Sequence, residues 1–363
     1  MEQNAAVLAP RGIDLGQPVI DVDIHVNVPS EQALVPYLSD HWREYLRYSA
    51  FKLPTDTAYP KGAPTSALPG TAPENGVPGS SLALVREHVL DAWNVEVGIL
   101  NCSYAADSLH NPDTAAAMSA AVNDWLIAEW LDKEPRLRAS IVVPSRVPEL
   151  AAKEIDRLGG HPGVVQVFLP AVSEAPYGHR RYWPIFEAAA RHDLVVSLQF
   201  GGAPGNPPTG AGWPSYYVEE YVGMAQVYQS QLLNLVVEGV FDHFPTLRMA
   251  MIEGGWTWLP SLMWRIDKDW KGLRREVPWN TRTPSEYIRE RMRFSLQPLD
   301  GAPDPKHMLM LIDQIGSDEV LMFSTDYPHW HFDRPEEAVP AGLPDVLRRK
   351  ILSENARSFY RLS

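Results

Sequence analysis

The sequence predicts a single (β/α)8 barrel, which is a ring of eight parallel strands with helices on its outside. Eight short, mostly apolar segments alternate with segments whose apolar residues recur at helical spacing, and this alternation is typical of a parallel sheet covered by helices. The chain of 363 residues is long enough for such a barrel. An open doubly wound sheet, the other fold with this alternation, normally has a glycine-rich turn after its first strand. Here the first strand ends in Asn27, Val28 and Pro29, which favours the barrel.

The elements follow one another in a regular order. The stretch 18–29 alternates polar and branched apolar residues and predicts the opening strand, and 31–48 predicts the first helix. The other seven strands are predicted from short apolar runs at 95–101, 137–144, 164–169, 194–200, 247–253, 292–297 and 320–326. Helices are predicted between them at 82–93, 114–131, 148–158, 182–191, 217–241, 256–270 and 305–315. A last helix is predicted at 344–360, and Pro344 suits its first position.

The whole chain, 1–363, is expected to form one domain. Residues 1–17 are interpreted as an N-terminal extension. Residues 51–81 contain six prolines and several glycines, and irregular segments of this length inside a compact domain are usually functional or disordered. We expect this proline-rich insertion, which follows the first strand and helix, to cover one mouth of the barrel.

Composition excludes several classes of partner. The net charge is −13 and no basic patch with interleaved aromatic residues is present, which argues against nucleic acid or an anionic membrane as partner. The single cysteine, Cys102, excludes an internal disulfide and a cysteine-based metal cluster. No apolar run approaches the roughly 18 residues of a membrane span, and the N-terminus does not have the pattern of a secretory signal. We therefore expect a cytoplasmic protein.

Polar residues gather where the predicted strands end, which is where barrel enzymes place their active sites. Asp21, Asp23, His25 and Asn27 fall at every second position of the opening strand, so they are expected on one of its faces. A strand with one face in water would show the same alternation. Later strands end in Gln199, Glu253 and Asp326, and His329 follows closely.

A divalent cation would explain this gathering of acids. Carboxylates buried in a barrel need a partner charge or a metal ion, and imidazole with carboxylate oxygens suits Zn²⁺ or Mn²⁺. Because the first and last strands become neighbours when the barrel closes, the acids and the histidine of these two strands together favour a metal site. Taken singly, His25 could be a hydrogen-bonded core histidine and Asp326 a turn residue. Asp21 is interpreted as a structural partner of the backbone or of an arginine.

Four stretches of the chain resemble a known family: 20–29, 323–330, 237–245 and 251–260. Together they are similar to the amidohydrolase superfamily, in particular to the amidohydrolase 2 branch around aminocarboxymuconate-semialdehyde decarboxylase, and the resemblance covers nearly the whole chain. It implies a (β/α)8 barrel with one divalent metal, commonly Zn²⁺ or Mn²⁺. It also implies hydrolysis or non-oxidative decarboxylation of a small organic acid, often aromatic or unsaturated, and a homodimer.

The resemblance also assigns roles to individual residues. Asp23 and His25 match the ligand pair of the first strand, and Asp326 matches the aspartate of the eighth. Gln199 stands where the family usually has a histidine ligand, and Glu253 stands where many members have a catalytic histidine. The predicted catalytic residues are Asp326, Glu253 and His329. The predicted substrate contacts are Asn27, Gln199, Trp213, Trp256 and Trp330.

Two classes of function remain open from the sequence. The first is a metal-dependent hydrolase or carboxy-lyase acting on a small organic acid. The second, suggested by Gln199, is a metal-free acid/base enzyme or a non-catalytic relative that binds a ligand at the same mouth.

Overall fold

The computed structural model describes residues 13, 15–52, 54, 67–202, 207–329 and 335–362. Most of the predicted N-terminal extension and part of the proline-rich insertion lie outside these ranges. Eight strands form one sheet in the order of the sequence, and every neighbouring pair is parallel. The strands are β1 (Val19–Val26), β2 (Val95–Cys102), β3 (Leu137–Val142), β4 (Val164–Val172), β5 (Val195–Gly202), β6 (Arg248–Met251), β7 (Met292–Ser295) and β8 (Leu321–Met322).

The sheet closes between β1 and the segment that follows β8. The Val22 amide donates to the Phe323 carbonyl at 3.1 Å, and the His25 amide donates to the Tyr327 carbonyl at 2.7 Å. The Asp326 amide donates back to the Asp23 carbonyl at 3.1 Å. These bonds confirm the predicted barrel and bring residues 23–25 beside residues 326–327.

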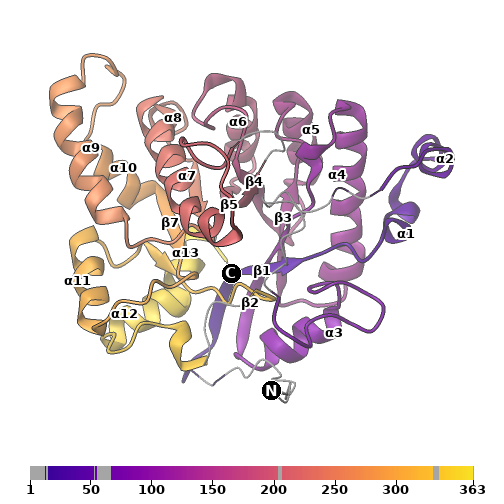
Figure 1. Ribbon diagram of the computed structural model, residues 1–363, viewed down its shortest axis with the longest axis horizontal. Helices are drawn as coiled ribbons and strands as arrows, with labels where there is room; N and C mark the ends of the chain where they lie inside the picture. Colours follow the sequence, from indigo (N-terminus) through magenta and orange to yellow (C-terminus); the bar gives the residue numbers. More distant parts are fainter. Residues whose placement is uncertain are drawn as a thin grey trace.

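Helices surround the strands on the outside (Figure 1). They are α1 (Glu31–Leu34), α2 (Asp40–Tyr48), α3 (Leu82–Val85), α4 (Pro112–Leu126), α5 (Pro148–Leu158), α6 (Trp183–Arg191), α7 (Tyr217–Val237), α8 (Val240–His243), α9 (Leu259–Leu273), α10 (Pro284–Arg291), α11 (Pro305–Ile315), α12 (Asp345–Arg349) and α13 (Asn355–Tyr360). Short 3₁₀ or π-helical segments lie at Val35–Tyr37, Arg86–Asp91, Ala106–Ser108, Ile127–Leu131, Arg180–Tyr182, Pro335–Ala338 and Lys350–Glu354. No helix among the described residues is long and apolar enough to span a membrane.

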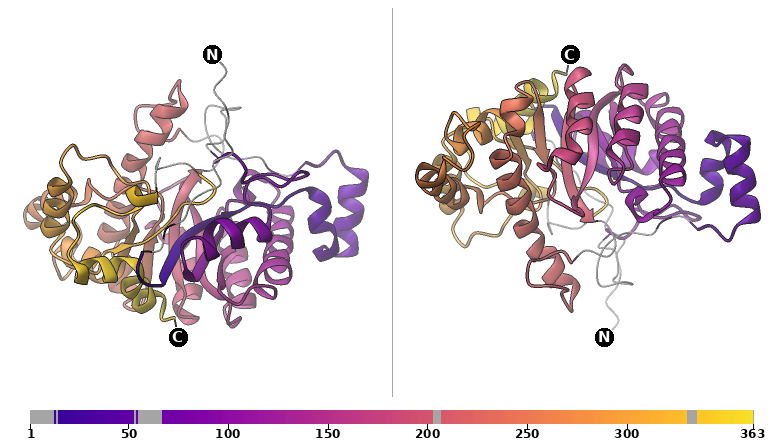
Figure 2. Two further views of the ribbon diagram at one scale, coloured as in Figure 1. Left: turned by 90° about the horizontal axis from the view of Figure 1, so that it is seen from below. Right: turned by 90° about the horizontal axis from the view of Figure 1, so that it is seen from above.

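Two predicted helices are divided in the structure. The helix expected at 31–48 is broken between α1 and α2, where the 3₁₀ turn Val35–Tyr37 contains Pro36 and ends in extended backbone at Leu38. Helix α2 buries no residue, and Figure 2 shows the indigo helices α1 and α2 at the outer edge of the molecule, where α1 contacts α4. The helix expected at 217–241 ends at Val237, because Gly239 adopts a left-handed conformation with φ of 76°.

The prediction that the alternating polar residues of β1 all lie on one face is wrong, because the strand contains an irregularity. Its register against β2 shifts between Asp21 and Ile24, as in a β-bulge. Ile20 and Val22 belong to a small apolar cluster whose other members come from strands all around the barrel and from α13. Ile24 and Val26 belong instead to the main core beneath the outer helices. Ile20 and Val22 therefore point into the barrel in the first half of β1, and Asp23 and His25 point into it in the second half.

Asp21 lies on the other side of this irregularity and has a structural role, as predicted. Its carboxylate accepts hydrogen bonds from the Thr325 hydroxyl at 2.6 Å, the Thr325 amide at 3.1 Å and the Asp23 amide at 3.0 Å. Burial raises the pKa of Asp21 to about 7. Asp21 thus ties β1 to the segment after β8.

Candidate active site

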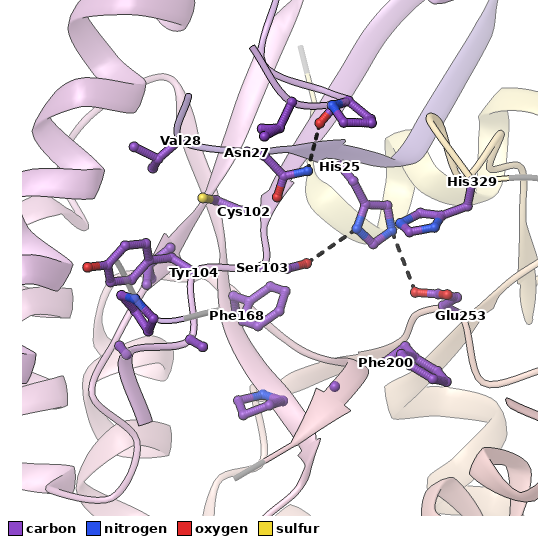
Figure 3. A pocket seen from close by; sticks show the side chains of 18 of the residues that line it. His25, Asn27, Val28, Cys102, Ser103, Tyr104, Phe168, Phe200, Glu253 and His329 are labelled. Carbon is purple, nitrogen blue, oxygen red and sulfur yellow. Dashed lines mark hydrogen bonds and ion pairs between the residues drawn. The ribbon is translucent and has the colours of Figure 1, made fainter. Parts of the chain in front are cut away.

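Four ionisable side chains meet at the carboxyl end of the strands and form what we call the mouth cluster: Asp23, His25, Glu253 and Asp326. His25 Nε2 lies 2.8 Å from Asp326 Oδ1, 3.3 Å from Asp23 Oδ1 and 3.5 Å from Glu253 Oε2. All four residues are buried. Figure 3 shows the side chains of His25 and Glu253 pointing toward each other from opposite sides of the pocket, with His329 beside them.

The backbone presents two of these carboxylates in an uncommon conformation. Glu253 follows β6 with φ of 63°, and Asp326 follows β8 with φ of 58°. Residues other than glycine rarely adopt this left-handed conformation, and when they do it is often at functional sites. β8 is also shorter than the predicted 320–326, so Asp326 lies on an irregular segment that turns its side chain toward His25.

The mouth cluster carries unbalanced charge. Burial opposes ionisation of Asp23, but the neighbouring His25 and the hydrogen bond from Asn101 hold the pKa of Asp23 below its ordinary value. Burial likewise disfavours the charged form of His25, yet Asp23 and Asp326 raise the pKa of His25 well above its ordinary value. Burial raises the pKa of Asp326 to about 8. One imidazole faces three carboxylates, so an additional positive charge, such as that of a metal ion, would be stabilised in the cluster.

The donor set fits a divalent cation. One ligand atom from each of the four residues lies within 4.8 Å of all the others. Asp23 Oδ2 is buried and makes no hydrogen bond to any described residue. Carboxylate oxygens with an imidazole nitrogen are ligands for Mn²⁺ and Zn²⁺. A second group of three, His25, Asp326 and His329, meets the same distance criterion.

An elongated pocket of about 320 Å³ opens beside the mouth cluster. His25, Glu253 and His329 lie in its wall, and Phe168 and Phe200 form part of its apolar side (Figure 3). Its lining residues within the described ranges include no lysine or arginine. The pocket therefore combines flat apolar walls with an acidic end.

The structure brings most of the predicted catalytic and metal residues together. Asp23, His25, Glu253 and Asp326 form the mouth cluster, and the His329 ring lies edge-on to the His25 ring with centroids 4.6 Å apart. Asn27 lines the pocket, and its Nδ2 donates to the Pro78 carbonyl at 2.8 Å. The structure thus brings these residues together, and their catalytic, metal-binding and substrate-binding roles stay predictions.

The other predicted substrate contacts are placed differently. Gln199 is fully buried behind the pocket wall, with its Nε2 at 3.4 Å from Asp23 Oδ1. Trp256 is fully buried in the main core, and Trp213 is half exposed, and neither lines the pocket. Trp330 lies outside the described residues. The aromatic residues that line the described part of the pocket are different ones, including Phe168 and Phe200.

Sequence reasoning missed several residues that the structure places at the site. Ser103 Oγ lies 3.4 Å from His25 Nδ1, and Asn101 Nδ2 donates to Asp23 Oδ1 at 2.8 Å. Phe168 in the middle of β4 and Phe200 near the carboxyl end of β5 line the pocket. Asn101 and Phe200 both end a predicted strand, and that position is the signal for them, but the sequence pattern assigned no role to either.

Comparison with known proteins identifies the family. The model of the amidohydrolase family matches residues 20–362, so the chain belongs to this family of barrel enzymes. A gamma-resorcylate decarboxylase from Polaromonas sp. (strain JS666) is 27% identical over 294 residues, which cover 77% of this chain and 87% of the relative.

Solved structures support the same fold. A 2,6-dihydroxybenzoate decarboxylase from Rhizobium superposes with a TM-score of 0.67 at 22% identity, covering 95% of this chain and 99% of the other. A dihydroxybenzoic acid decarboxylase from Polaromonas sp. JS666, with bound manganese and the inhibitor 2-nitroresorcinol, also gives a TM-score of 0.67 at 22% identity. It covers 95% of this chain and 97% of that chain. At this level of identity the two structures establish the shared barrel.

Proposed function

We propose that the protein is a metal-dependent decarboxylase that removes CO2 from a hydroxylated aromatic monocarboxylic acid. The observation that carries this proposal is the mouth cluster, in which three buried carboxylates and one imidazole meet at the acidic end of an apolar pocket. The names of the similar proteins, decarboxylases of gamma-resorcylate and dihydroxybenzoate, support the reaction and the class of substrate.

Asp23, His25 and Asp326 would hold the metal ion, and Glu253 lies within reach of the same point. The carboxylate-rich donor set suits Mn²⁺, the ion bound by one of the similar structures. When bound, such an ion would supply positive charge that stabilises negative charge on the oxygens of the substrate.

Asp326 is the group we assign to proton transfer. Burial disfavours the charged form of Asp326, and a metal ion would need only one of its two carboxylate oxygens, so the other oxygen can carry the proton. It would donate that proton to the ring carbon that carries the carboxylate. The carbon–carbon bond then breaks, its electron pair returns to the ring, CO2 leaves, and Asp326 regains a proton from water.

The pocket favours one carboxylate on an aromatic ring. Phe168 and Phe200 offer flat apolar contact. Glu253 and Asp107 line the pocket and can accept hydrogen bonds from ring hydroxyls. Since the described lining residues include no lysine or arginine, a second carboxylate would be desolvated there without a partner.

The metal-free alternative rests on Gln199, a neutral side chain where the family usually has a histidine. The excess of acid in the mouth cluster argues against it, because three buried carboxylates without a cation repel one another. The homodimer and the cytoplasmic location stay predictions.

The test is CO2 release from 2,6-dihydroxybenzoate by protein stripped with a chelator and then supplied with Mn²⁺. We expect turnover that disappears with the ion and returns with it, and no turnover of a benzene dicarboxylate. Binding of a stoichiometric ion without CO2 release from any hydroxybenzoate would contradict decarboxylation. Turnover that survives complete removal of the ion would support the metal-free alternative.

A further inference from the structure

A row of polar side chains crosses the interior of the barrel below the mouth cluster, and we call it the interior chain: Asp23, Asn101, Ser140, Gln166 and Tyr360. These residues come from β1, β2, β3, β4 and α13, and each of them is at least nine-tenths buried. Barrel interiors are normally filled by Val, Ile and Leu. Buried polar groups lower stability unless every one of them is hydrogen-bonded, so this row calls for an explanation.

The interior chain is joined by hydrogen bonds from one end to the other. The Tyr360 hydroxyl donates to Gln166 Oε1 at 2.6 Å, and Gln166 Nε2 donates to Asn101 Oδ1 at 3.0 Å and to Ser140 Oγ at 2.8 Å. The Ser140 hydroxyl donates to Asn101 Oδ1 at 2.5 Å. Asn101 Nδ2 completes the row by donating to Asp23 Oδ1 at 2.8 Å.

The direction of these bonds fixes the orientation of each amide. Asp23 Oδ1 and the Val22 carbonyl can only accept, so Asn101 Nδ2 must face them. Asn101 Oδ1 then accepts from Gln166 Nε2 and the Ser140 hydroxyl, and Gln166 Oε1 is left to accept from the Tyr360 hydroxyl. A rotated Asn101 amide would place its oxygen against the Asp23 carboxylate and the Val22 carbonyl, and its NH2 group against that of Gln166.

This orientation of the Asn101 amide decides which carboxylate oxygen of Asp23 is available to bind a metal ion. Oδ1 is held by Asn101, and Oδ2 makes no hydrogen bond to any described residue. We propose that Gln166 and Tyr360 are positioning residues of the metal site, acting through Asn101 to hold Asp23 so that Oδ2 stays directed to a divalent cation. Neither residue lines the pocket, so neither contacts the substrate there.

This inference rests on the proposed metal-dependent function, and it is tested by ion binding rather than by turnover alone. The variants are Tyr360→Phe, which removes one hydroxyl, and Gln166→Met, which keeps the length of the side chain and removes the three hydrogen bonds of its amide. Two matched controls lie elsewhere. Tyr287→Phe removes a buried hydroxyl that donates to Asp242, and Gln231→Met removes a buried amide that donates to the Ala171 carbonyl.

The affinity for Mn²⁺ is measured by titration calorimetry, and the unfolding of the ion-free protein by urea. We expect Tyr360→Phe and Gln166→Met to raise the Kd for Mn²⁺ about tenfold, the size typical for changes behind a ligand, and kcat to recover at saturating Mn²⁺. The two controls should lower the stability of the ion-free protein by similar amounts and leave the Kd for Mn²⁺ unchanged.

Two results would overturn the inference, and they are distinguishable. If the wild-type protein binds Mn²⁺ and both variants bind it with the wild-type Kd, the interior chain is only structural and the proposed function stands. If the wild-type protein itself binds no Mn²⁺, the metal-dependent function fails together with the inference.

Discussion

Charged side chains cluster at both ends of the described strands, each cluster around at least one buried acid, and the two clusters are built differently. At the amino end, Glu134 precedes β3 and accepts hydrogen bonds from Arg86 Nε at 2.8 Å and Arg136 Nε at 2.9 Å. Arg136 also pairs with Asp91 at 2.8 Å. This Glu134 cluster holds two acids and two guanidinium groups, and the hydrogen bonds from Arg136 and Arg86 lower the pKa of Glu134 to about 2 despite burial.

The mouth cluster has no such balance. Its three carboxylates share one imidazole, and burial raises the pKa of Asp326 to about 8. A buried cluster that only stabilises the fold tends to contain its own counter-charges, because a buried charge without a partner is costly. A cluster with an excess of one sign can bind an ion or a proton from outside, and such perturbed groups gather at functional sites. The comparison therefore distinguishes the Glu134 cluster, which stabilises the fold, from the mouth cluster, which can bind an ion or a proton.

Asp326→Asn should give the largest effect on activity. The amide keeps the shape of the side chain but cannot deliver a carboxyl proton, so we expect kcat for CO2 release to fall about 10²- to 10⁴-fold. The free energy of unfolding of the ion-free protein should stay equal or rise, because one buried carboxyl is replaced by a neutral group. Wild-type turnover in this variant would contradict the assignment of Asp326.

Glu134→Gln should show the opposite pattern, which is a loss of stability without a loss of activity. Removing the charge weakens or breaks three charge-assisted hydrogen bonds, one from Arg86 and two from Arg136, so we expect the free energy of unfolding to fall by about 1.5–3 kcal/mol at pH 7, with kcat unchanged. Because the pKa of Glu134 is depressed in the folded protein, from 4.5 to about 2, its contribution is complete above pH 4.5. It is lost as the pH falls toward 2. Urea unfolding at pH 7 and at pH 3 measures this loss.

The matched control for Glu134→Gln is Asp91→Asn, which changes the more exposed acid of the same cluster. It should cost less stability than Glu134→Gln. An equal cost for the two variants, or a difference that persists unchanged to pH 2, would show that burial of Glu134 is not the source of the stabilisation.

Gln199→His tests the mouth cluster by adding an imidazole. Gln199 Nε2 lies 3.4 Å from Asp23 Oδ1, so a histidine at this position can bring a nitrogen close to the metal site. We expect the Kd for Zn²⁺ to fall by about tenfold, the scale of a change in ligand environment, because imidazole suits Zn²⁺. Calorimetric titration of wild type, Gln199→His and Gln199→Asn checks this. An unchanged Kd in Gln199→His would place the ion away from β5.

The two clusters also show what the sequence can predict. Asp23, His25, Glu253 and Asp326 were found because each lies at or just beyond the end of an apolar strand, and strand ends meet at one mouth in a barrel. The irregularity of β1 was not found, because residues 18–29 alternate without interruption and only pairing with β2 reveals the shift. Trp256 was expected at the pocket because it follows Glu253 closely, but the turn that leads into α9 packs it into the core.

The interior chain could not be predicted from local sequence patterns, for a different reason. Gln166 and Tyr360 are 194 positions apart in the sequence, and each has an ordinary neighbourhood in the sequence. Gln166 interrupts an apolar strand, and Tyr360 ends an amphipathic helix. Only the closed barrel brings them together, so their role depends on a contact that no sequence spacing encodes.

Arg357→Ala should give the smallest effect and completes the comparison. Arg357 pairs with Glu96 at 2.6 Å, but both side chains are exposed, at 36% and 43%. Water already stabilises both charges, so we expect the free energy of unfolding to change by only about 0–1 kcal/mol, and less at high salt. If urea unfolding showed a loss as large as that of Glu134→Gln, pairing alone would account for the stabilisation. The contrast between the two ends of the barrel would then rest on the excess of carboxylates at the mouth, and not on burial.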